Sequence, residues 1–272
     1  MVLPHCDIVN PSVETPAVCR VLTVLEGAER VVVVTGAGMS AESGVPTFRD
    51  ALTGLWARYD PEELATQQAF RRNPARVFGW YLARLHGVRR VEPHPGYHAL
   101  VEMARLLGQL PIVTQNVDGL HRRAGSEDVI ELHGSLLTFR CLDGGHAYAV
   151  DDVLALGAPE VDAPVDPPTC LQCGSFVRPC VVWFGEMLPM DALQRAWDLV
   201  SSADAVIVVG TSAMVYPAAE LPVIAKAAGA RVIEINPIPT PLTPQADVYW
   251  AARAGDALPQ LTRGLRAGRM TA

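Results

Sequence analysis

Apolar residues along the chain gather in short runs rich in valine and isoleucine, and longer segments with helical spacing separate these runs. The runs at residues 31–34 (VVVV) and 206–209 (VIVV) are continuously apolar and do not alternate with polar residues. Such runs are typical of strands in a parallel sheet that helices cover on both faces. We therefore predict buried strands at residues 30–35, 110–114, 129–132, 205–209, 231–235 and 247–250.

The segments between these strands predict helices at residues 16–29, 95–107, 191–201, 218–229 and 256–266. Alternating strands and helices predict an α/β fold with a doubly wound, Rossmann-like parallel sheet, built from residues 1–50, 89–134 and 181–272. Two stretches interrupt the alternation. Residues 51–88 have a helical pattern, and residues 135–180 are rich in loops and contain four cysteines. We predict that these two inserts form a small second domain.

Composition narrows the classes of protein that fit this chain of 272 residues. Half of the residues are hydrophobic, which is enough for a sizeable core and excludes wholesale disorder. The net charge of −7 argues against a nucleic-acid partner. Neither a membrane-spanning run of about 20 apolar residues nor a secretory leader is found, so we expect a cytoplasmic protein without a membrane partner. In that compartment the cysteines are expected to bind metal or pack, and not to form disulfides.

Ligands of an open α/β sheet bind beyond the carboxyl ends of its strands. The residues that follow the predicted strands are glycines, small hydroxyls, amides, one carboxylate and one histidine, in the segments 36–40, 115–118, 133–134, 210–212 and at Asn236. This set suits a ligand that carries phosphates and ribose. Two alternatives stay open at this level: the glycine turn at 36–40 also fits a tight turn without a ligand, and Asn236 also fits an Asn-Pro turn.

Several of these segments together resemble the sirtuin family, the NAD-dependent protein deacylases. The matching motifs are GAGMSAESGVPTFR (36–49), TQNVDGLH (114–121), ELHGS (131–135), VVWFGE (181–186), GTS (210–212) and IN (235–236). They occur in the family's order and span most of the chain. The resemblance implies that the α/β domain binds NAD, and that the protein transfers an acyl group from lysine to ADP-ribose.

The resemblance also implies roles for single residues. His133 is the general base that activates a ribose hydroxyl, and Asn116 and Asp118 border the nicotinamide pocket and the ribose. Without the resemblance, a histidine at a strand end is more simply a satisfied polar residue. The residues expected to bind NAD are Gly36, Ala37, Gly38, Ser40, Ser43, Pro46, Phe48, Arg49, Gln115, Asn116, Asp118, Gly210, Thr211, Ser212, Asn236 and Ala254.

By the same resemblance, the partner is an acylated-lysine protein or peptide, which adds as a strand between the two domains. The segment Val182, Trp183, Phe184, Gly185 and Glu186 is expected to border that cleft and the tunnel for the lysine. Ordinary core packing is the alternative for its apolar members, Trp183 above all.

Tyr81 and Arg84 lie three residues apart, and so are neighbours at one edge of the apolar stripe of a predicted helix. An aromatic core residue beside a surface arginine is the plain interpretation. The spacing, however, resembles the Y-x-x-R element of class III sirtuins, which remove succinyl, malonyl and glutaryl groups. The nearby small residue in Leu64-Ala65-Thr66 is similar to that class too. The resemblance thus implies that Arg84 and Tyr81 bind an acyl carboxylate, with acetyl removal alongside.

The cysteine pattern departs from the two C-x-x-C pairs that hold a structural zinc in sirtuins. The second pair, Cys170 and Cys173, is intact, but Cys141 has no partner three residues later. Zinc needs four ligands in a closed structural site, so His146 or Asp143 is a candidate for the fourth. A lost or labile zinc site is the alternative. Cys180, which precedes VVWFGE, is expected to pack.

Two other activities remain open from sequence. A mono-ADP-ribosyltransferase would use the same NAD chemistry but leave ADP-ribose on a protein. A module that binds NAD without turnover is disfavoured because His133, Asn116 and Asp118 are all present.

Overall fold

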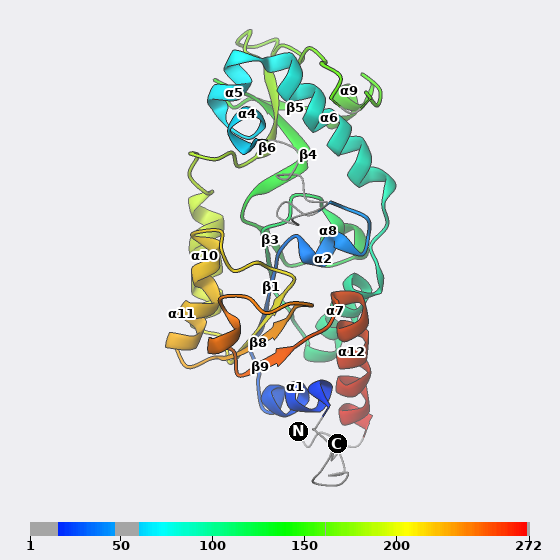
Figure 1. Cartoon of the computed structure of the whole chain (residues 1–272), viewed down its shortest axis with the longest axis vertical. Helices are drawn as coiled ribbons and strands as arrows, with labels where there is room; N and C mark the ends of the chain where they lie inside the picture. Colours follow the sequence, from blue (N-terminus) through cyan, green and yellow to red (C-terminus); the bar gives the residue numbers. More distant parts are fainter. Residues whose placement is uncertain (1–15, 47–59, 161, 271–272) are drawn as a thin grey trace.

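The computed structural model describes residues 16–46, 60–160 and 162–270 (Figure 1). Its main sheet has six strands in the order β3-β2-β1-β7-β8-β9, and each neighbouring pair is parallel. This is the strand order of a doubly wound, Rossmann-type sheet. The strands are β1 (Val31–Thr35), β2 (Ile112–Thr114), β3 (Val129–Glu131), β7 (Ala205–Val209), β8 (Arg231–Ile235) and β9 (Val248–Trp250). The predicted fold class is confirmed, and all six predicted strands are present.

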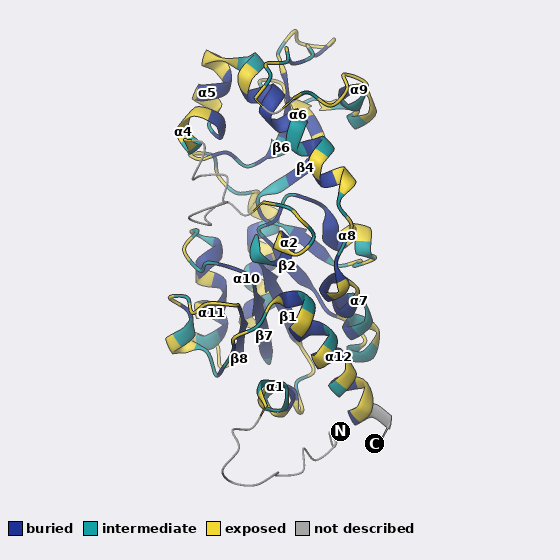
Figure 2. Cartoon of the chain, turned by 45° about the vertical axis from the view of Figure 1, so that its right-hand side comes forward, coloured by how far each residue is buried: buried dark blue, intermediate teal, exposed yellow. Residues whose placement is uncertain are grey.

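Helices cover both faces of this sheet, as the continuous valine runs predict. Val31 and Val33 of β1 pack into one core with α1 (Ala17–Leu25), α7 (Pro95–Leu107) and α12 (Ala254–Met270). Val32 and Val34 point to the other core, with α10 (Met190–Ser201), the 3-10 turn η1 (Ala218–Glu220) and α11 (Leu221–Ala227). Successive side chains of a strand point to opposite faces, so every position of a strand between two cores is buried and favours an apolar residue. Figure 2 shows these strands as buried between partly exposed helices.

Local signals set where helices begin and end. Helix α7 begins at Pro95, after the ring of His94 accepts a hydrogen bond of 3.0 Å from the Gly96 amide. It ends at Leu107, and the next residue, Gly108, has a φ of 85°, which suits glycine better than any other residue. Short helices α2 (Gly38–Ala41) and α8 (Leu120–Ala124) follow β1 and β2, and a 3-10 turn, η2 (Thr243–Gln245), precedes β9.

A smaller part of the molecule lies at the upper end of Figure 1, beyond the carboxyl ends of the parallel strands. It contains a three-stranded antiparallel sheet in the order β5-β4-β6, covered by helices. Its elements are α4 (Pro61–Leu64), α5 (Gln67–Arg72), α6 (Pro74–Arg90), β4 (Gly134–Cys141), β5 (Ala147–Tyr148), α9 (Val150–Leu154) and β6 (Val177–Val181). Phe70 and Phe78 share one core with Leu136 and Val177, so the two predicted inserts pack against each other. The domain boundaries given above stay a prediction.

Strands β4 to β6 were not expected, since the sequence suggested mainly loops at 135–180. Strand β5 has only two residues, and β6 carries Arg178 and Pro179 in its middle. Such strands show neither a continuous apolar run nor clean alternation, and antiparallel pairing with β4 holds both in place.

Two further expectations concern cysteines and membranes. Cys19 in α1 is disulfide-bonded, whereas Cys141, Cys170, Cys173 and Cys180 are free. The expectation of no disulfides is therefore wrong for Cys19, because sequence spacing does not tell which cysteines the fold brings together. Among the helices that the structure describes, none combines the length and the apolar character needed to cross a bilayer.

Candidate active site

Two glycine turns meet at the carboxyl ends of β1 and β7. The Gly38 amide donates a hydrogen bond of 2.7 Å to the Gly210 carbonyl. A Cβ on Gly36 would lie 2.8 Å from the Thr211 Cα, and one on Gly38 would lie 2.8 Å from the Gly210 Cα. Gly210 itself has a φ of 60°. Only glycine fits this contact, which leaves bare backbone facing the strand ends, where a pyrophosphate can approach closely.

Polar side chains from three strand ends join in one buried network beside these turns. The Asn116 amide donates to the Gly36 carbonyl and to the Ser40 hydroxyl, both at 2.9 Å. Ser40 donates to an Asp118 carboxylate oxygen at 2.6 Å. Tyr97 of α7 also bonds Ser40, at 2.8 Å between the two oxygens. Burial raises the pKa of Asp118, while its bond from Ser40 opposes the rise. These side chains are locked by one another before any ligand enters.

His133 follows β3 and is half-buried. Its Nδ1 lies 3.0 Å from the backbone carbonyl oxygen of Gln115. A carbonyl can only accept, so Nδ1 carries the hydrogen of this bond and Nε2 keeps a lone pair. Burial lowers the pKa of His133 below 6.5, although the bond to Gln115 opposes the effect. The ring is therefore neutral near pH 7 and can accept a proton at Nε2.

The other predicted NAD-binding residues surround the same strand ends. Gln115 donates to the Thr211 hydroxyl at 3.2 Å, and Asn236 donates to the Thr211 carbonyl at 3.1 Å. The Asn236 side chain thus joins the turn after β8 to the turn after β7. Ser43 accepts a bond from the His94 amide, and Ala254 is buried at the start of α12. Phe48 and Arg49 lie outside the described residues.

A small pocket lies between the cofactor turn and the upper part of the molecule. Its lining residues come from both parts and are Ala37, Ser40, Val45, Pro46, Arg84, Val88, Asn116, Val117, Asp118 and Leu136. Arg84 therefore reaches the same pocket as Asn116 and Asp118. A larger open hollow at the amino ends of β1, β7 and β8 is lined by the Arg30–Asp204 ion pair, among others, and holds none of the predicted site residues.

Tyr81 and Arg84 lie on α6, above this pocket. Tyr81 is buried, and its hydroxyl accepts a hydrogen bond of 2.9 Å from the indole N–H of Trp183. Arg84 is half-buried, with its guanidinium carbon 4.6 Å from the Trp80 ring centroid and 5.8 Å from that of Tyr81. Burial raises the pKa of Tyr81 to about 12 and lowers the pKa of Arg84. Tyr81 therefore keeps its proton near pH 7.

The segment after β6 runs between the two parts of the molecule. The Val182 amide donates to the His133 carbonyl at 2.8 Å, and the Phe184 amide donates to the Ala65 carbonyl at 2.8 Å. Phe184 is exposed and Val182 half-buried, whereas Trp183 is only 1% exposed. Trp183 is thus a packed residue beneath Tyr81. Gly185 is exposed, and Glu186 bonds the Trp183 amide at 2.9 Å.

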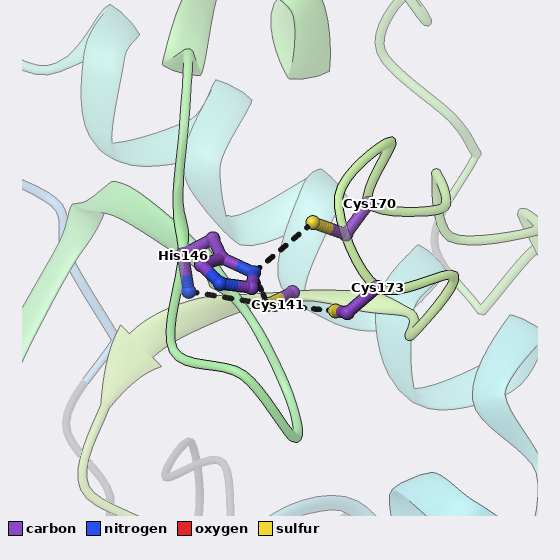
Figure 3. A group of neighbouring side chains, drawn as sticks. All are labelled: Cys141, His146, Cys170 and Cys173. Carbon is purple, nitrogen blue, oxygen red and sulfur yellow. Dashed lines mark hydrogen bonds between the residues drawn. The ribbon is translucent and has the colours of Figure 1, made fainter.

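Four side chains at the turns flanking β4 and β6 form a cluster that could hold a metal ion (Figure 3). They are Cys141, His146, Cys170 and Cys173, whose ligand atoms all lie within 4.8 Å of one another. His146 Nδ1 lies 3.4 Å from the Cys141 sulfur and 3.5 Å from the Cys170 sulfur. Tetrahedral zinc with bonds of about 2.0–2.3 Å requires ligand separations of this order. Asp143 instead pairs with Arg71 and Ser175, so of the two candidates for the fourth ligand the geometry favours His146.

Known proteins of similar sequence identify the family of this chain. A model of the Sir2 family matches residues 36–217. This chain belongs to the Sir2 family. It is 49% identical to a protein named NAD-dependent protein deacylase 2 of Pyrobaculum aerophilum, over 91% of this chain and 95% of that protein. The predicted sirtuin family, and with it NAD-dependent deacylase chemistry, is confirmed.

Solved sirtuin structures are similar in fold as well. A Sir2 homologue in complex with NAD has a TM-score of 0.82 and 47% identity, covering 91% of this chain and 93% of that one. A Sir2 protein bound to a myristoylated histone peptide has a TM-score of 0.76 and 36% identity, covering 94% and 99%. The glycine cradle fits NAD as the cofactor, and the Cys₃His cluster fits a structural zinc.

Some residues of the site were not foreseen from the sequence. Tyr97, which holds Ser40, follows a His-Pro-Gly helix start and is marked by no motif. Arg178 is buried against Trp183 and Glu186, and only its place in the apolar sequence VRPCVV could have drawn attention to it. The predicted NAD and acyl-group residues within the described ranges are brought to one region, and their individual roles are taken up as proposals.

Proposed function

We propose that this chain removes acyl groups from lysine side chains of proteins, preferring acyl groups that end in a carboxylate. Succinyl, malonyl and glutaryl are the groups meant, with acetyl removal as a second activity. NAD, the acyl-lysine and one water molecule give nicotinamide, O-acyl-ADP-ribose and the bare lysine. The deacylase name of the Pyrobaculum relative and the histone peptide bound to the Sir2 neighbour support a protein substrate.

NAD supplies the ADP-ribose that accepts the acyl group, and the residues of this chain hold it and move a proton. The turns at Gly36–Gly38 and Gly210 present backbone to the pyrophosphate. Asn116 and Asp118, fixed through Ser40, border the nicotinamide end. With NAD bound, His133 would accept a proton from a ribose hydroxyl at Nε2, since the Gln115 carbonyl holds Nδ1 protonated. When ionised, the Asp118 carboxylate would supply negative charge to a positively charged nicotinamide end of NAD in this pocket.

The observation that carries the acyl preference is the pair of donors on α6. A carboxylate entering an apolar tunnel is costly to bury without partners. Arg84 offers a charged guanidinium at the pocket, and Tyr81 beside it has a hydroxyl that keeps its proton. Charge-assisted bonds from such donors offset the cost of burial. The Ala65 carbonyl accepts a hydrogen bond from the Phe184 amide, and the resemblance to class III sirtuins implies that its small side chain leaves room for the longer acyl chain.

One peptide carrying acetyl, malonyl, succinyl or glutaryl lysine tests the proposal, each assayed with and without NAD. The wild-type protein should have a higher kcat/KM for the acidic acyl groups than for acetyl. The variant Tyr81→Phe with Arg84→Met should lose about 10- to 150-fold on succinyl-lysine, the size of a hydrogen bond to a charged group. Acetyl-lysine has no carboxylate, so its deacylation should be spared.

Arg76→Gln is the matched control, because Arg76 lies on the same helix and pairs with Glu63 on the surface. It should leave the ratio of succinyl to acetyl activity unchanged. Equal losses on both substrates in the double variant would reduce the assignment to an ordinary deacetylase. Mass spectrometry of the products separates the remaining class, because ADP-ribose found on protein would indicate a transferase instead.

A further inference from the structure

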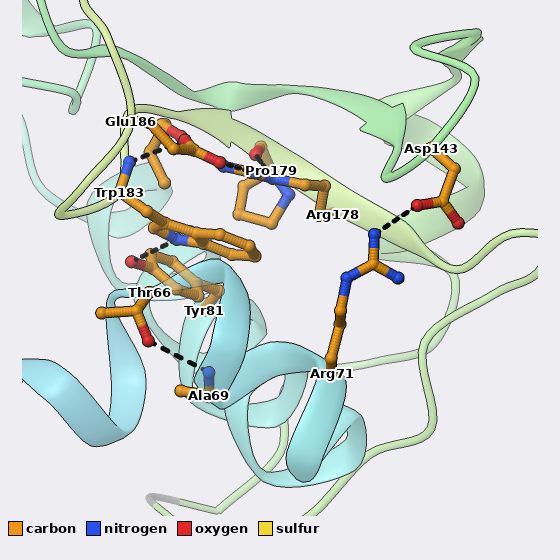
Figure 4. Close-up of polar contacts among 10 residues, drawn as sticks. Thr66, Ala69, Arg71, Tyr81, Asp143, Arg178, Pro179, Trp183 and Glu186 are labelled. Atoms are coloured by element: carbon orange, nitrogen blue, oxygen red, sulfur yellow. Dashed lines mark hydrogen bonds and ion pairs between the residues drawn. The ribbon is translucent and has the colours of Figure 1, made fainter.

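An ion pair between Arg178 and Glu186 lies beside Trp183 (Figure 4). Arg178 of β6 makes two bonds to the Glu186 carboxylate, at 2.5 Å and 3.1 Å, and its side chain is only 2% exposed. Two more of its N–H groups donate to the carbonyls of Val181 at 2.7 Å and Pro179 at 3.2 Å. Removing a guanidinium from water is costly unless its donors are all satisfied. Few substitutions would preserve this arrangement, because a lysine cannot reproduce the planar fork.

This ion pair holds Trp183 from two directions. The guanidinium carbon of Arg178 lies 3.4 Å from the centroid of the Trp183 ring, in cation–π contact. Glu186 accepts the backbone N–H of Trp183 at 2.9 Å. The plane of the indole and the start of its side chain are therefore both fixed by Arg178 and Glu186.

The fixed indole in turn orients Tyr81. The Trp183 N–H donates to the Tyr81 hydroxyl oxygen at 2.9 Å, across 102 residues of sequence. An indole N–H can only donate, so this bond occupies a lone pair of the hydroxyl and leaves the hydroxyl hydrogen for an acceptor. Burial raises the pKa of Tyr81 to about 12, so the hydrogen is retained near pH 7. The acceptor that the proposed function supplies is an acyl carboxylate.

We infer that Arg178 and Glu186 are positioning residues that, through Trp183, hold the Tyr81 hydroxyl as a hydrogen-bond donor and thereby set the preference for acidic acyl groups. The inference rests on the proposed function and adds to it residues that need not touch the substrate through their own side chains. Arg178 acts at a distance because each contact in the series restricts the next one.

A double-mutant cycle tests this dependence. Arg178→Lys keeps the charge but loses the fork and the planar contact, and it is made in the wild type and in Tyr81→Phe. In the wild-type background it should lower the ratio of succinyl to acetyl kcat/KM by about tenfold, close to one hydrogen bond to a charged group. In the Tyr81→Phe background the same change should leave the ratio within about twofold, because the hydroxyl is already absent.

Equal falls of the ratio in both backgrounds would overturn the inference while leaving the proposed function intact. A wild-type protein without preference for acidic acyl groups would overturn the proposed function, and the selectivity role of Arg178 with it. Arg76→Gln again serves as the control for loss of an arginine pair in this part of the molecule.

An NMR measurement separates positioning from misfolding. The chain has five tryptophans, and the indole N–H signal that disappears in Trp183→Phe identifies Trp183. This signal should shift in Tyr81→Phe, which removes its acceptor, and shift in the same direction in Arg178→Lys. The other indole signals should stay in place in the folded variants. If Arg178→Lys fails to fold, Glu186→Gln takes its place in the cycle, since it keeps the side-chain shape; an unshifted Trp183 signal there would contradict the inference.

Discussion

The cofactor side of the active site and the acyl side differ in what holds their functional groups. On the cofactor side the groups follow parallel strands directly, and glycine backbones and short side chains fix one another over short distances. On the acyl side Tyr81 depends on Trp183, which depends on an ion pair at Arg178 and on the packing of a separate core. The first kind of site is fixed by the strand order of the sheet, whereas the second is fixed by contacts between distant segments. We therefore expect damage to the cofactor side to affect all acyl substrates alike, and damage near α6 to discriminate among them.

Removing zinc should have the largest effect and should act on the small part of the molecule. Structural zinc contributes an apparent ~10–16 kcal/mol in small metal-dependent folds. Purified protein should contain about one zinc per chain, and chelation should lower its melting temperature and its peptide turnover. Cys173→Ser should do the same, while Cys180→Ser, a free cysteine outside the cluster, should not. Metal analysis without zinc, together with unchanged melting after chelation, would show that the cluster is merely packed thiols.

His133→Ala should have the next largest effect, and on every acyl group equally. A base that acts in the transition state contributes about 10²–10⁴-fold to rate. NAD affinity, measured by calorimetry, should stay close to that of the wild type because the glycine turns are untouched. His98→Ala, an exposed histidine on α7, is the control. More than about a tenth of wild-type turnover in His133→Ala would contradict the role of base.

Some parts of this molecule could be predicted from the sequence and others could not. The six strands and the cofactor residues after them could be predicted because valine runs, glycines and strand ends lie in fixed local relation. Tyr81 and Arg84 could be paired by helical spacing, but Trp183 could not be placed under Tyr81, since no local rule joins residues 102 apart. His146 became the favoured fourth metal ligand only once β4 and β5 brought it to Cys141. The Cys19 disulfide was missed because sequence spacing does not reveal which thiols meet.

Gly210→Ala should weaken NAD binding, with a smaller effect on activity than His133→Ala. The added methyl would collide with the backbone of Gly38 and Met39, and overpacking of this kind costs about 1–3 kcal/mol. Gly229→Ala is the matched control, because Gly229 also has a positive φ but no atom within 4 Å of the added Cβ. Calorimetry with NAD should show weaker binding for Gly210→Ala alone. Binding by Gly210→Ala as tight as that of Gly229→Ala would contradict the role of the contact between the two turns in NAD binding.

The smallest effect concerns pH. His133 must be neutral to act as a base, and activity falls as pH drops through its pKa. Because burial lowers that pKa below 6.5, the acid limb of kcat/KM should lie below pH 6.5. Every acyl peptide should give the same limb, and protein returned to neutral pH should recover full activity. An acid limb at or above pH 6.5 would mean that the groups around His133 favour its protonated form.

The backbone contact between Gly36, Gly38 and Gly210 also bears on how this protein can be engineered. The two turns form a single joint, so a library that varies one of them while freezing the other will mostly sample clashes. Redesign of the cofactor end therefore has to vary both turns together. The acyl end offers more freedom, since Tyr81 and Arg84 lie on a helix whose backbone a side-chain exchange leaves unchanged.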